Sequence, residues 1–384
     1  MTVRYTLLLL TFFVAGPFAP SLSHADERIW LDGKINGKRV RLAFDTGSSD
    51  FALWFGTIEK LGLKFISDPT NDYPSGVLAG VTEVCDLKMA GARGKTQFLV
   101  LDQPGHIFPD FDGFIGWNFI GERVLQIDAI HKKIAFLSEV PKKATQWNRL
   151  RVFTKFHRLD VELPSAEGTN GVVCIDTGWQ GGLELPESDW RRWKSSHPQS
   201  PTTLQAVYFP ADGFGTPEQA WSDEIAVGPI VLNGVPIEQS PPGRAKEIGP
   251  QYRGSLGLTA LKRMDFIVDA KNGWAYFRPI TTPPPVFDHN RLGAVFRPEG
   301  IHTNQAVARV VKDSPAYEAN VRDGDLLLQV NDVKVTSWSE RWINQFYRPA
   351  GTKLELTLER NGEILKTTVT LRDILKPGLG KKTQ

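Results

Sequence analysis

The pattern of apolar and polar residues near the start of the chain is typical of a half-buried β-strand. Val40, Leu42 and Phe44 alternate mainly with basic residues in the segment KINGKRVRLAFDTG, so one face of the strand is apolar and the other is charged. Asn36-Gly37 comes just before this run, and this dipeptide supplies the positive φ angles of a tight turn. The segment therefore predicts a β-hairpin whose second strand leads into Asp-Thr-Gly.

The same kind of pattern continues along much of the chain. Polar turns separate β-branched and aromatic runs in IDAIHKKIAFL (127–137) and in FIVDAKNGWAYF (266–277), which predicts two more hairpins. Short helices are expected in GTIEKLG (56–62) and in PESDWRRWKSS (186–196). The predicted fold class is therefore mostly β.

An internal repeat organises these elements. Asp-Thr-Gly occurs at 45–47 and again at 176–178, each time at the end of an apolar run. An apolar-apolar-Gly motif follows each copy downstream, and the aspartate of a predicted hairpin follows that glycine after the same interval of 12 residues: Gly116 to Asp128 and Gly257 to Asp269. The shared order and spacing predict a duplicated unit.

The composition changes after the second copy. The segment 281–288 is rich in proline and predicts an extended linker. Strand-like runs and a short helix start follow it and predict a separate small domain at 289–374, with a basic tail at 375–384. The duplicated unit then divides the rest into a first lobe at 26–145 and a second lobe at 146–280.

The first 25 residues have the pattern of a secretory signal peptide. Arg4 precedes a short apolar run, and Ser-His-Ala at 23–25 offers a cleavage site with small residues. We therefore expect an exported protein, periplasmic or secreted, with an uncleaved membrane anchor as the alternative. Hydrophobic residues make up 41% of the chain, enough for packed cores, and the net charge of +2 argues against a dedicated nucleic-acid binder. Whether Cys85 and Cys174 form a disulfide is left open by the sequence.

Two carboxylates brought into one site can carry out acid–base chemistry. If the two units face each other, each Asp-Thr-Gly turn projects its carboxylate into a shared cleft, and Gly47 and Gly178 permit the tight turns. Two carboxylates about 3 Å apart cannot both ionise, so they share a proton and supply an acid and a base together. Such a pair can direct water at an amide without a metal or cofactor. The scattered histidines and the lack of HExxH, GxSxG and P-loop motifs argue against a metal-dependent hydrolase, a serine hydrolase and a nucleotide-binding enzyme.

These motifs carry a resemblance to a known family. The two Asp-Thr-Gly sequences, each followed by apolar-apolar-Gly, resemble the aspartic proteases of the pepsin and retropepsin superfamily, and DGFIGWNFI with IDAIHKKIAFL resembles bacterial retropepsin-like lobes. The segment VVKDSPAYEANVRDGDLLLQVNDVKV (310–335) resembles a PDZ domain. The resemblance implies a bilobal, acid-protease-like double β-barrel followed by a small PDZ-like α+β domain. It also implies an aspartic endopeptidase that hydrolyses peptide bonds.

The resemblance assigns roles to single residues. Asp45 and Asp176 would be catalytic, sharing the proton and holding the water. The remaining residues of the active-site turns would be Thr46, Gly47, Ser48, Thr177 and Gly178. The Ser48 hydroxyl would bond its aspartate and favour an ionised Asp45, which leaves Asp176 as the protonated partner.

Other expected contacts surround the turns. Trp179 replaces the usual hydroxyl residue of the second turn, and it either lines a substrate subsite or packs in the core of a lobe that has lost activity. A flap is expected within 71–84, where Tyr73 and Gly76 would approach the substrate.

The PDZ-like domain implies a peptide ligand as well as polypeptide substrates. Its loop Leu292, Gly293 and Ala294 would capture a peptide carboxylate through backbone N–H groups, with a purely structural role as the alternative. We expect no nucleic acid, no stable membrane span after signal cleavage, and a monomer. The alternative function is a catalytically inactive, exported peptide-binding protein that keeps the bilobal cleft.

Overall fold

The computed structural model describes most of the chain. The described residues are 28–67, 77–101, 111–153, 155, 157–165, 170–209, 213–240, 249–280, 287–299, 305–336 and 340–375. The expected signal peptide and the expected flap residues Tyr73 and Gly76 lie outside them. In the described part, none of the helices has the length and apolar character needed to cross a membrane.

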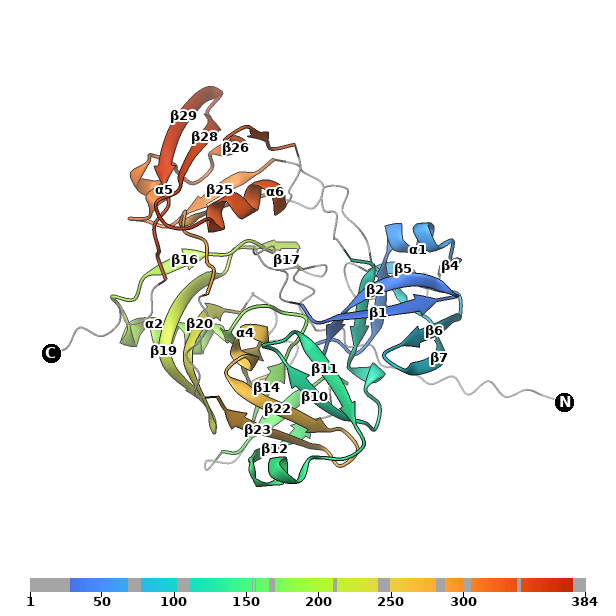
Figure 1. Ribbon diagram of the computed structural model, residues 1–384. Helices are drawn as coiled ribbons and strands as arrows, with labels where there is room; N and C mark the ends of the chain where they lie inside the picture. The colour runs from blue at the N-terminus through green and yellow to red at the C-terminus, as the bar shows by residue number, and fades with distance from the viewer. Residues whose placement is uncertain are drawn as a thin grey trace.

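The chain forms a mostly β protein with two lobes and a small C-terminal domain, as predicted (Figure 1). The first lobe contains β1 (Trp30–Ile35), β2 (Lys38–Asp45), β3 (Phe51–Trp54), α1 (Phe55–Leu61), β4 (Phe65–Ser67), β5 (Val77–Thr82), β6 (Cys85–Met89), β7 (Ala92–Thr96), β8 (Leu99–Leu101), β9 (Gly113–Gly116) and the 3-10 helix η1 (Trp117–Phe119). Its strands form one sheet in the order β4-β5-β8-β3-β9-β2-β1-β6-β7.

The predicted hairpin before the first Asp-Thr-Gly is confirmed. Strands β1 and β2 pair antiparallel with Ile35 opposite Lys38, and the two turn residues Asn36 and Gly37 have φ angles of 47° and 83°. The apolar face of β2 supplies Val40, Leu42 and Phe44 to the core, as the alternation indicates. The register of the hairpin and the buried face of β2 therefore fix the position of Asp45 at the end of the strand.

The second lobe and the connection to it form a twelve-stranded sheet. Its elements are β10 (Val124–Asp128), β11 (Lys133–Leu137), the 3-10 helix η2 (Lys142–Gln146), β12 (Asn148–Phe153), β13 (Asp160–Leu163), β14 (Gly171–Ile175), β15 (Leu183–Leu185), α2 (Glu187–Ser196), β16 (Thr202–Leu204), β19 (Glu218–Val227), β20 (Ile230–Gln239), β21 (Tyr252–Leu256), α4 (Leu258–Leu261), β22 (Met264–Asp269) and β23 (Trp274–Pro279). Strands β17 (Val207–Phe209) and β18 (Gly213–Gly215) pair separately. The order of the large sheet is β11-β10-β22-β23-β12-β13-β14-β21-β15-β20-β19-β16.

The two repeated hairpins meet in this sheet. β10 and β11 come from the first unit and β22 and β23 from the second, and β10 pairs antiparallel with β22. Gln126 lies opposite Ile267, and these residues occupy equivalent positions, two residues before Asp128 and Asp269. The duplicated units are therefore related by an approximate two-fold axis at this pair, and one buried apolar core continues through both lobes.

The C-terminal domain is a smaller sheet with its own core. It contains β24 (Ala294–Arg297), β25 (Val307–Val310), α5 (Pro315–Glu318), β26 (Leu326–Val330), β27 (Val333–Lys334), α6 (Glu340–Ile343), η3 (Asn344–Tyr347), β28 (Lys353–Arg360) and β29 (Glu363–Thr370). Ser314 caps α5 by accepting a hydrogen bond from Tyr317 N at 3.2 Å, and Pro315 is the first helical residue. The buried Asp325 carboxylate pairs with Arg360 and joins β26 to β28.

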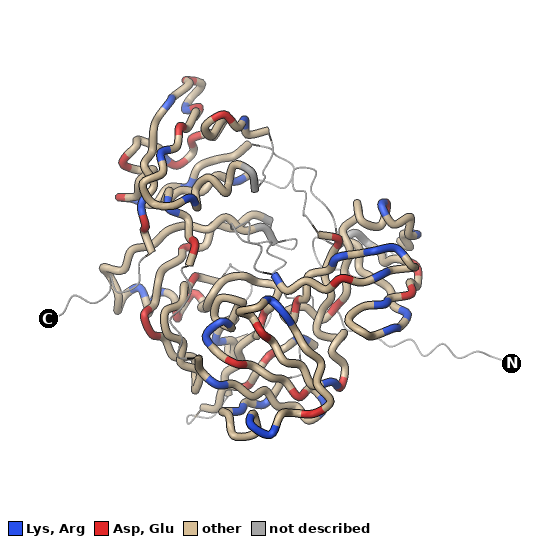
Figure 2. The backbone as a smooth tube through the Cα atoms, viewed as in Figure 1, with Lys and Arg blue, Asp and Glu red and all other residues tan. Residues whose placement is uncertain are grey.

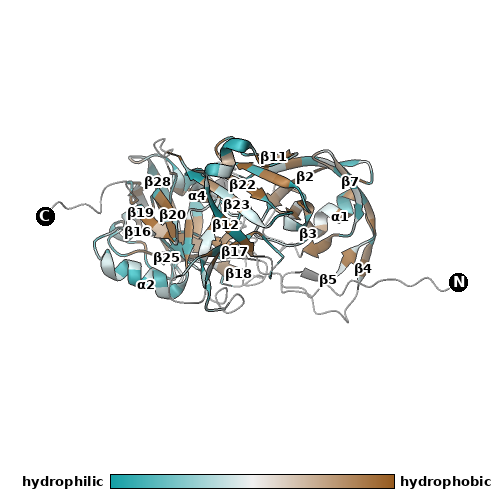
Figure 3. Cartoon of the chain, turned by 90° about the horizontal axis from the view of Figure 1, so that it is seen from below, coloured by the Kyte–Doolittle hydropathy of each residue, from teal (hydrophilic) through white to brown (hydrophobic). Residues whose placement is uncertain are grey.

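The distribution of side chains agrees with this division. In Figure 2, Lys and Arg are interspersed with Asp and Glu along the chain, as the small net charge suggests. In Figure 3, apolar residues concentrate in the strands, whereas α2 is largely hydrophilic. Trp190 and Trp193 form the buried face of α2, which confirms the helix predicted there.

Candidate functional site

The two Asp-Thr-Gly sequences occupy the same place in their lobes. Each follows a buried strand, β2 or β14, that pairs in parallel with the strand carrying the downstream apolar-apolar-Gly motif, β9 or β21. Asp45 lies beside Gly116, and Asp176 N donates to Leu256 O at 2.9 Å. The repeated motifs seen in the sequence are therefore direct neighbours in both lobes.

The motif glycines allow the backbone to pass close behind each turn. A Cβ atom on Gly116 would lie 2.7 Å from Ser48 O, and a Cβ atom on Gly257 would lie 2.8 Å from Trp179 O. A Cβ atom at either distance would clash with the carbonyl oxygen, so only glycine fits at these two positions. Trp117 N and Leu258 N, the next amides along, donate to those same two carbonyl oxygens at 2.7 and 2.9 Å.

Reciprocal threonine hydrogen bonds hold the two turns together. Thr46 N donates to Thr177 Oγ1 and Thr177 N donates to Thr46 Oγ1, each at 3.1 Å. Each hydroxyl also donates across the boundary: Thr46 Oγ1 to Ile175 O at 2.5 Å, and Thr177 Oγ1 to Phe44 O at 2.7 Å. All four hydrogen bonds are buried and link opposite lobes, so each turn fixes the position of the other.

The two carboxyl groups are held in equivalent ways. Gly47 N donates to Asp45 Oδ1 at 2.9 Å, and Gly178 N donates to Asp176 Oδ1 at 3.0 Å. Asp45 is 1% exposed and Asp176 is 0% exposed. Backbone N–H groups therefore orient both carboxyls in a region that is almost fully buried.

Each carboxyl group also packs against the opposite turn. A Cβ atom on Gly47 would lie 2.5 Å from Asp176 Cγ, and a Cβ atom on Gly178 would lie 2.4 Å from Asp45 Cγ. Glycine at both positions is what lets the two carboxyl groups approach. Two ionised carboxylates held in neighbouring buried turns would repel each other.

The residues after the two glycines differ in environment. The Ser48 hydroxyl accepts a hydrogen bond from Asp50 N at 3.3 Å, while Trp179 N donates to Asp176 Oδ1 at 3.1 Å. The Trp179 indole is 2% exposed and packs against Gly181 and Gly257. This corrects the expectation of a substrate contact from Trp179, because its side chain belongs to the core of the second lobe.

A polar group next to the first turn was missed from the sequence. Ser49 Oγ donates to Asp50 Oδ2 at 2.5 Å. Burial raises the pKa of the Asp50 carboxyl, and the bond from Ser49 and the charge of His157 oppose that shift. The Ser-Ser-Asp run after Asp-Thr-Gly is the only sequence signal for this group.

A second missed feature lies behind the turns. Leu159 N donates to Thr46 O at 2.9 Å, and Leu159 O accepts from Ile175 N at 2.8 Å. The flanking Arg158 and Asp160 form a buried ion pair with Nε–Oδ distances of 3.0 Å. One segment of the second lobe therefore supports both turns, and its sequence carries no motif that would show this.

The expected carboxylate-binding loop is part of the C-terminal domain core. Leu292 and Ala294 are 0% exposed, and Gly293 has a φ of +70°. Leu292 N and Gly293 N both donate to Asn290 Oδ1, at 3.0 and 3.3 Å. Peptide capture by this loop stays a prediction, and in this structure its amides already have an acceptor within the chain.

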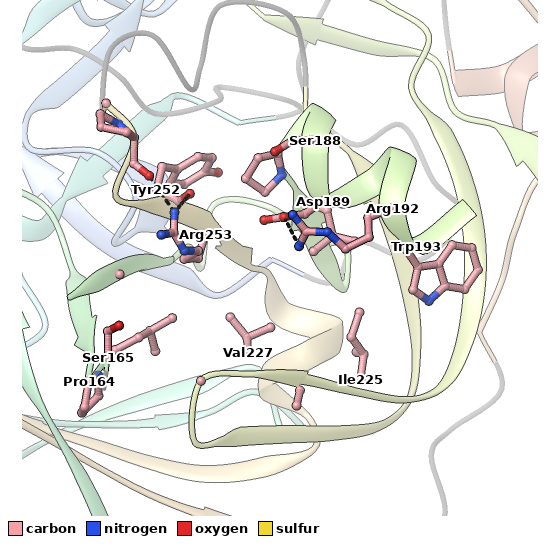
Figure 4. A pocket seen from close by; sticks show the side chains of 18 of the residues that line it. Pro164, Ser165, Ser188, Asp189, Arg192, Trp193, Ile225, Val227, Tyr252 and Arg253 are labelled. Carbon is pink, nitrogen blue, oxygen red and sulfur yellow. Dashed lines mark hydrogen bonds and ion pairs between the residues drawn. The ribbon is translucent and has the colours of Figure 1, made fainter. Parts of the chain in front are cut away.

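A cavity of about 1050 Å³ lies elsewhere in the second lobe (Figure 4). Its walls come from α2, from the turn between β19 and β20, and from the beginning of β21; among them are Leu185, Arg192, Val227 and Tyr252. Asp45 and Asp176 do not line it, so this cavity is separate from the paired turns.

The described residues contain no group of three or more His, Cys, Asp and Glu side chains that could hold a metal ion. Cys85 and Cys174 are buried thiols that do not form a disulfide.

Comparison with known proteins identifies one part of the chain. Residues 284–359 match the family model of the PDZ domain. The chain contains a C-terminal PDZ domain. This confirms the PDZ resemblance, and the described core of the domain extends beyond the matched segment to Leu371.

Three curated relatives are similar to short stretches of the chain. The zinc metalloprotease RasP of Shouchella clausii (strain KSM-K16) is 33% identical over 76 residues, which cover 20% of this chain and 18% of the relative. A probable serine protease do-like of Buchnera aphidicola subsp. Acyrthosiphon pisum (strain APS) is 33% identical over 76 residues, covering 20% and 16%. Serine protease HTRA1 of Xenopus tropicalis is 31% identical over 68 residues, covering 18% and 14%. The chain therefore spans less than a fifth of the length of each relative, and no stretch is longer than the PDZ segment.

The comparisons contradict the prediction of an aspartic endopeptidase. Two relatives are named serine proteases and one a zinc metalloprotease, and none of the three is an aspartic protease. The alternative of an inactive peptide-binding protein finds no support among these names either, since all three are those of proteases. The prediction depended on two Asp-Thr-Gly motifs of three residues each, which are too short to establish a class of protease.

Proposed function

We propose that this chain is a peptidase with a PDZ domain, and that its peptide-cleaving site lies at the paired Asp-Thr-Gly turns. The names of the relatives support the reaction. The observation that carries the location is the reciprocal Thr46–Thr177 network, which brings two buried aspartates from separate lobes to one place.

The arrangement favours a functional role, because burying two carboxyl groups costs free energy of folding that a purely structural turn would not need to lose. Burying two carboxyl groups against each other opposes folding, and the fold stabilises them with backbone N–H donors and with glycines that leave them room. Buried acidic groups that face one another are characteristic of functional sites, which supports this location. Asp45 and Asp176 are accordingly proposed to lie in the site that receives the polypeptide substrate, whichever group attacks the peptide bond.

Cleavage of a fluorescein-labelled, heat-denatured protein from acidic to neutral pH tests the proposal. We expect cleavage by the wild type, and a fall in kcat/KM of about 100-fold or more in each of Asp45→Asn and Asp176→Asn. Asp128→Asn is the matched control, since it removes a partly exposed carboxylate of the inter-lobe hairpin and should leave kcat/KM unchanged. Absence of cleavage by the wild type, or full activity of either of the first two variants, overturns the proposal.

Further arms identify the nucleophile. A fluorophosphonate probe reports a reactive serine, with Ser48→Ala and Ser49→Ala as the variants nearest the site, and a zinc chelator reports a metal-dependent reaction. Labelling of a serine far from the turns would place the active site elsewhere and reject the location.

We also propose that the chain is exported, on the evidence of its signal-like N-terminus. Expression in a bacterial host followed by N-terminal sequencing of the periplasmic fraction should give Asp26 as the first residue. Recovery of only the uncleaved chain from membranes would contradict export as a cleaved protein.

A further inference from the structure

The loop of the PDZ domain that could receive a carboxylate already holds an acceptor from its own chain. The Asn290 side chain is 2% exposed, and its Oδ1 accepts from Leu292 N and Gly293 N. Successive backbone N–H groups that converge on one oxygen are the arrangement by which loops capture a peptide carboxylate. Asn290 therefore occupies the position of the ligand oxygen.

The same residue attaches the PDZ domain to the second lobe. Asn290 Nδ2 donates to Leu204 O in β16 at 3.0 Å and to Ala294 O at 2.7 Å. The Asn290 carbonyl accepts from Thr203 Oγ1, also in β16, at 2.8 Å. The hydrogen bonds that fill the loop and those that join it to the lobe thus meet at one residue, through its side chain and its backbone carbonyl.

Apolar contacts extend this attachment. Ala206 and Phe214 of the second lobe pack against the core of the PDZ domain. Figure 1 shows β16 and β17 running along the side of the domain that carries β25 and α6. β16 itself is the edge strand of the second lobe's sheet. The contact is consequently an interface between domains and not a local loop conformation.

We propose that Asn290 is an internal substitute for a peptide carboxylate, and that a peptide with a free C-terminus displaces it and releases β16 from the PDZ domain. The ligand class is a polypeptide C-terminus, because the two backbone N–H groups of the loop that Asn290 occupies are donors suited to a carboxylate oxygen. The lobe and the peptide compete for the same loop.

The exchange is physically reasonable. A carboxylate accepts stronger hydrogen bonds from two N–H groups than a neutral amide oxygen does. Displacement also breaks the bonds from Asn290 to Leu204 and Ala294, so the docked state lowers the apparent affinity for a peptide. Any variant that weakens docking without touching the loop should therefore strengthen peptide binding.

Thr203 offers that variant. Thr203→Val keeps the shape of the side chain and removes the hydroxyl that bonds Asn290 O, whereas Thr203→Ser keeps the hydroxyl and is the matched control. The probes are fluorescein-labelled ten-residue peptides ending in Val, Leu or Phe, each with a free or an amidated C-terminus. Binding is measured by fluorescence anisotropy with the full chain, and mass spectrometry of the probe after each measurement confirms that it is intact, so that binding and peptide cleavage are distinguished.

We expect Thr203→Val to bind at least one free-acid peptide about five-fold tighter than the wild type, because about one hydrogen bond of docking energy is lost. Thr203→Ser should match the wild type, and the amidated peptides should not bind. Hydrogen exchange at 202–204 should speed up when the free-acid peptide is added. Asn290→Ala is a second route to the same result, with circular dichroism to confirm that it folds.

Any one of several results overturns the proposal. These are equal affinity of wild type and Thr203→Val, equal binding of free and amidated peptides, and binding that leaves exchange at 202–204 unchanged. Absence of binding in every variant has the same consequence, since the loop would then be only a structural turn.

Discussion

The two Asp-Thr-Gly turns have the same backbone and different surroundings. Hydrogen bonds to the carboxyls, the threonine network and the close-packed glycine behind each turn are repeated almost bond for bond. After the glycine the first turn enters a polar group with Ser48 and Asp50, whereas the second sends Trp179 into the core. The geometry of each turn is therefore set by Asp-Thr-Gly and the parallel strand beside it. The residue after the glycine makes contacts within its own lobe and can differ between the two.

The comparison is tested most strongly at the position where the lobes differ. Trp179→Ala should lower the free energy of unfolding by about 3–5 kcal/mol, because a buried indole leaves a large cavity. Ser48→Ala should cost about 1 kcal/mol or less, since it removes one long hydrogen bond. Urea unfolding measures both. Similar costs for the two would show that the residues do the same structural work.

The threonine network should respond equally in both lobes. Thr46→Val and Thr177→Val each leave a buried N–H and a buried carbonyl without their threonine partner, so each should cost about 2–3 kcal/mol. Each substitution removes a different pair of bonds, but the two turns are in direct contact, so loosening one should weaken the bonds of the other and the double variant should cost less than the sum of the two. Unfolding free energies of all three variants decide this, and strictly additive costs would mean that the turns are held independently.

The turn glycines allow a further symmetric test. Gly47→Ala and Gly178→Ala place a methyl group against the opposite carboxyl and should each cost about 1–3 kcal/mol and lower cleavage in the assay above. Gly94→Ala is the control, because nothing lies within 4 Å of its added Cβ. Thermal unfolding and the rate of cleavage are measured for all three variants. A loss in the first two but not in Gly94→Ala indicates a steric effect at the turns, whereas a loss in all three indicates a general effect of replacing glycine in a β-protein. A harmless Gly178→Ala beside a harmful Gly47→Ala would break the symmetry.

The smallest expected effect concerns pH and belongs to the first turn alone. Burial raises the pKa of Asp50 above its unfolded value of 3.8, so the unfolded chain loses this proton first as pH rises. Asp50 should therefore reduce the stability progressively as pH rises from that value through its folded pKa. Asp50→Asn should remove this part of the pH dependence in unfolding titrations. An unchanged profile would show that the shift is absent.

Local pattern was sufficient to predict much of the fold. The Asn36-Gly37 turn, the alternating strand into Asp45 and the α2 helix all follow from short-range chemistry. The repeat correctly indicated equivalent lobes because the Gly116–Asp128 interval encodes a short helix and the first strand of a hairpin, as the Gly257–Asp269 interval does.

The remaining features depend on contacts between distant segments. Nothing in the sequence near Leu159 shows that its backbone supports Thr46, more than a hundred residues earlier. Asn290 looks like an ordinary loop residue until β16 is placed beside it. Trp179 fitted either a subsite or a core, and only the positions of Gly181 and Gly257 decide between them.

The Gln126–Ile267 pairing has a consequence for how the chain is made. A ribosome releases β10 and β11 long before β22 exists, so the nascent first unit presents an unpaired strand edge for the time needed to synthesise the second. The axis that passes through this pair means that the best substitute for the absent strand is β10 of another nascent copy. A translation product that stops after β11 should consequently assemble as a strand-paired homodimer.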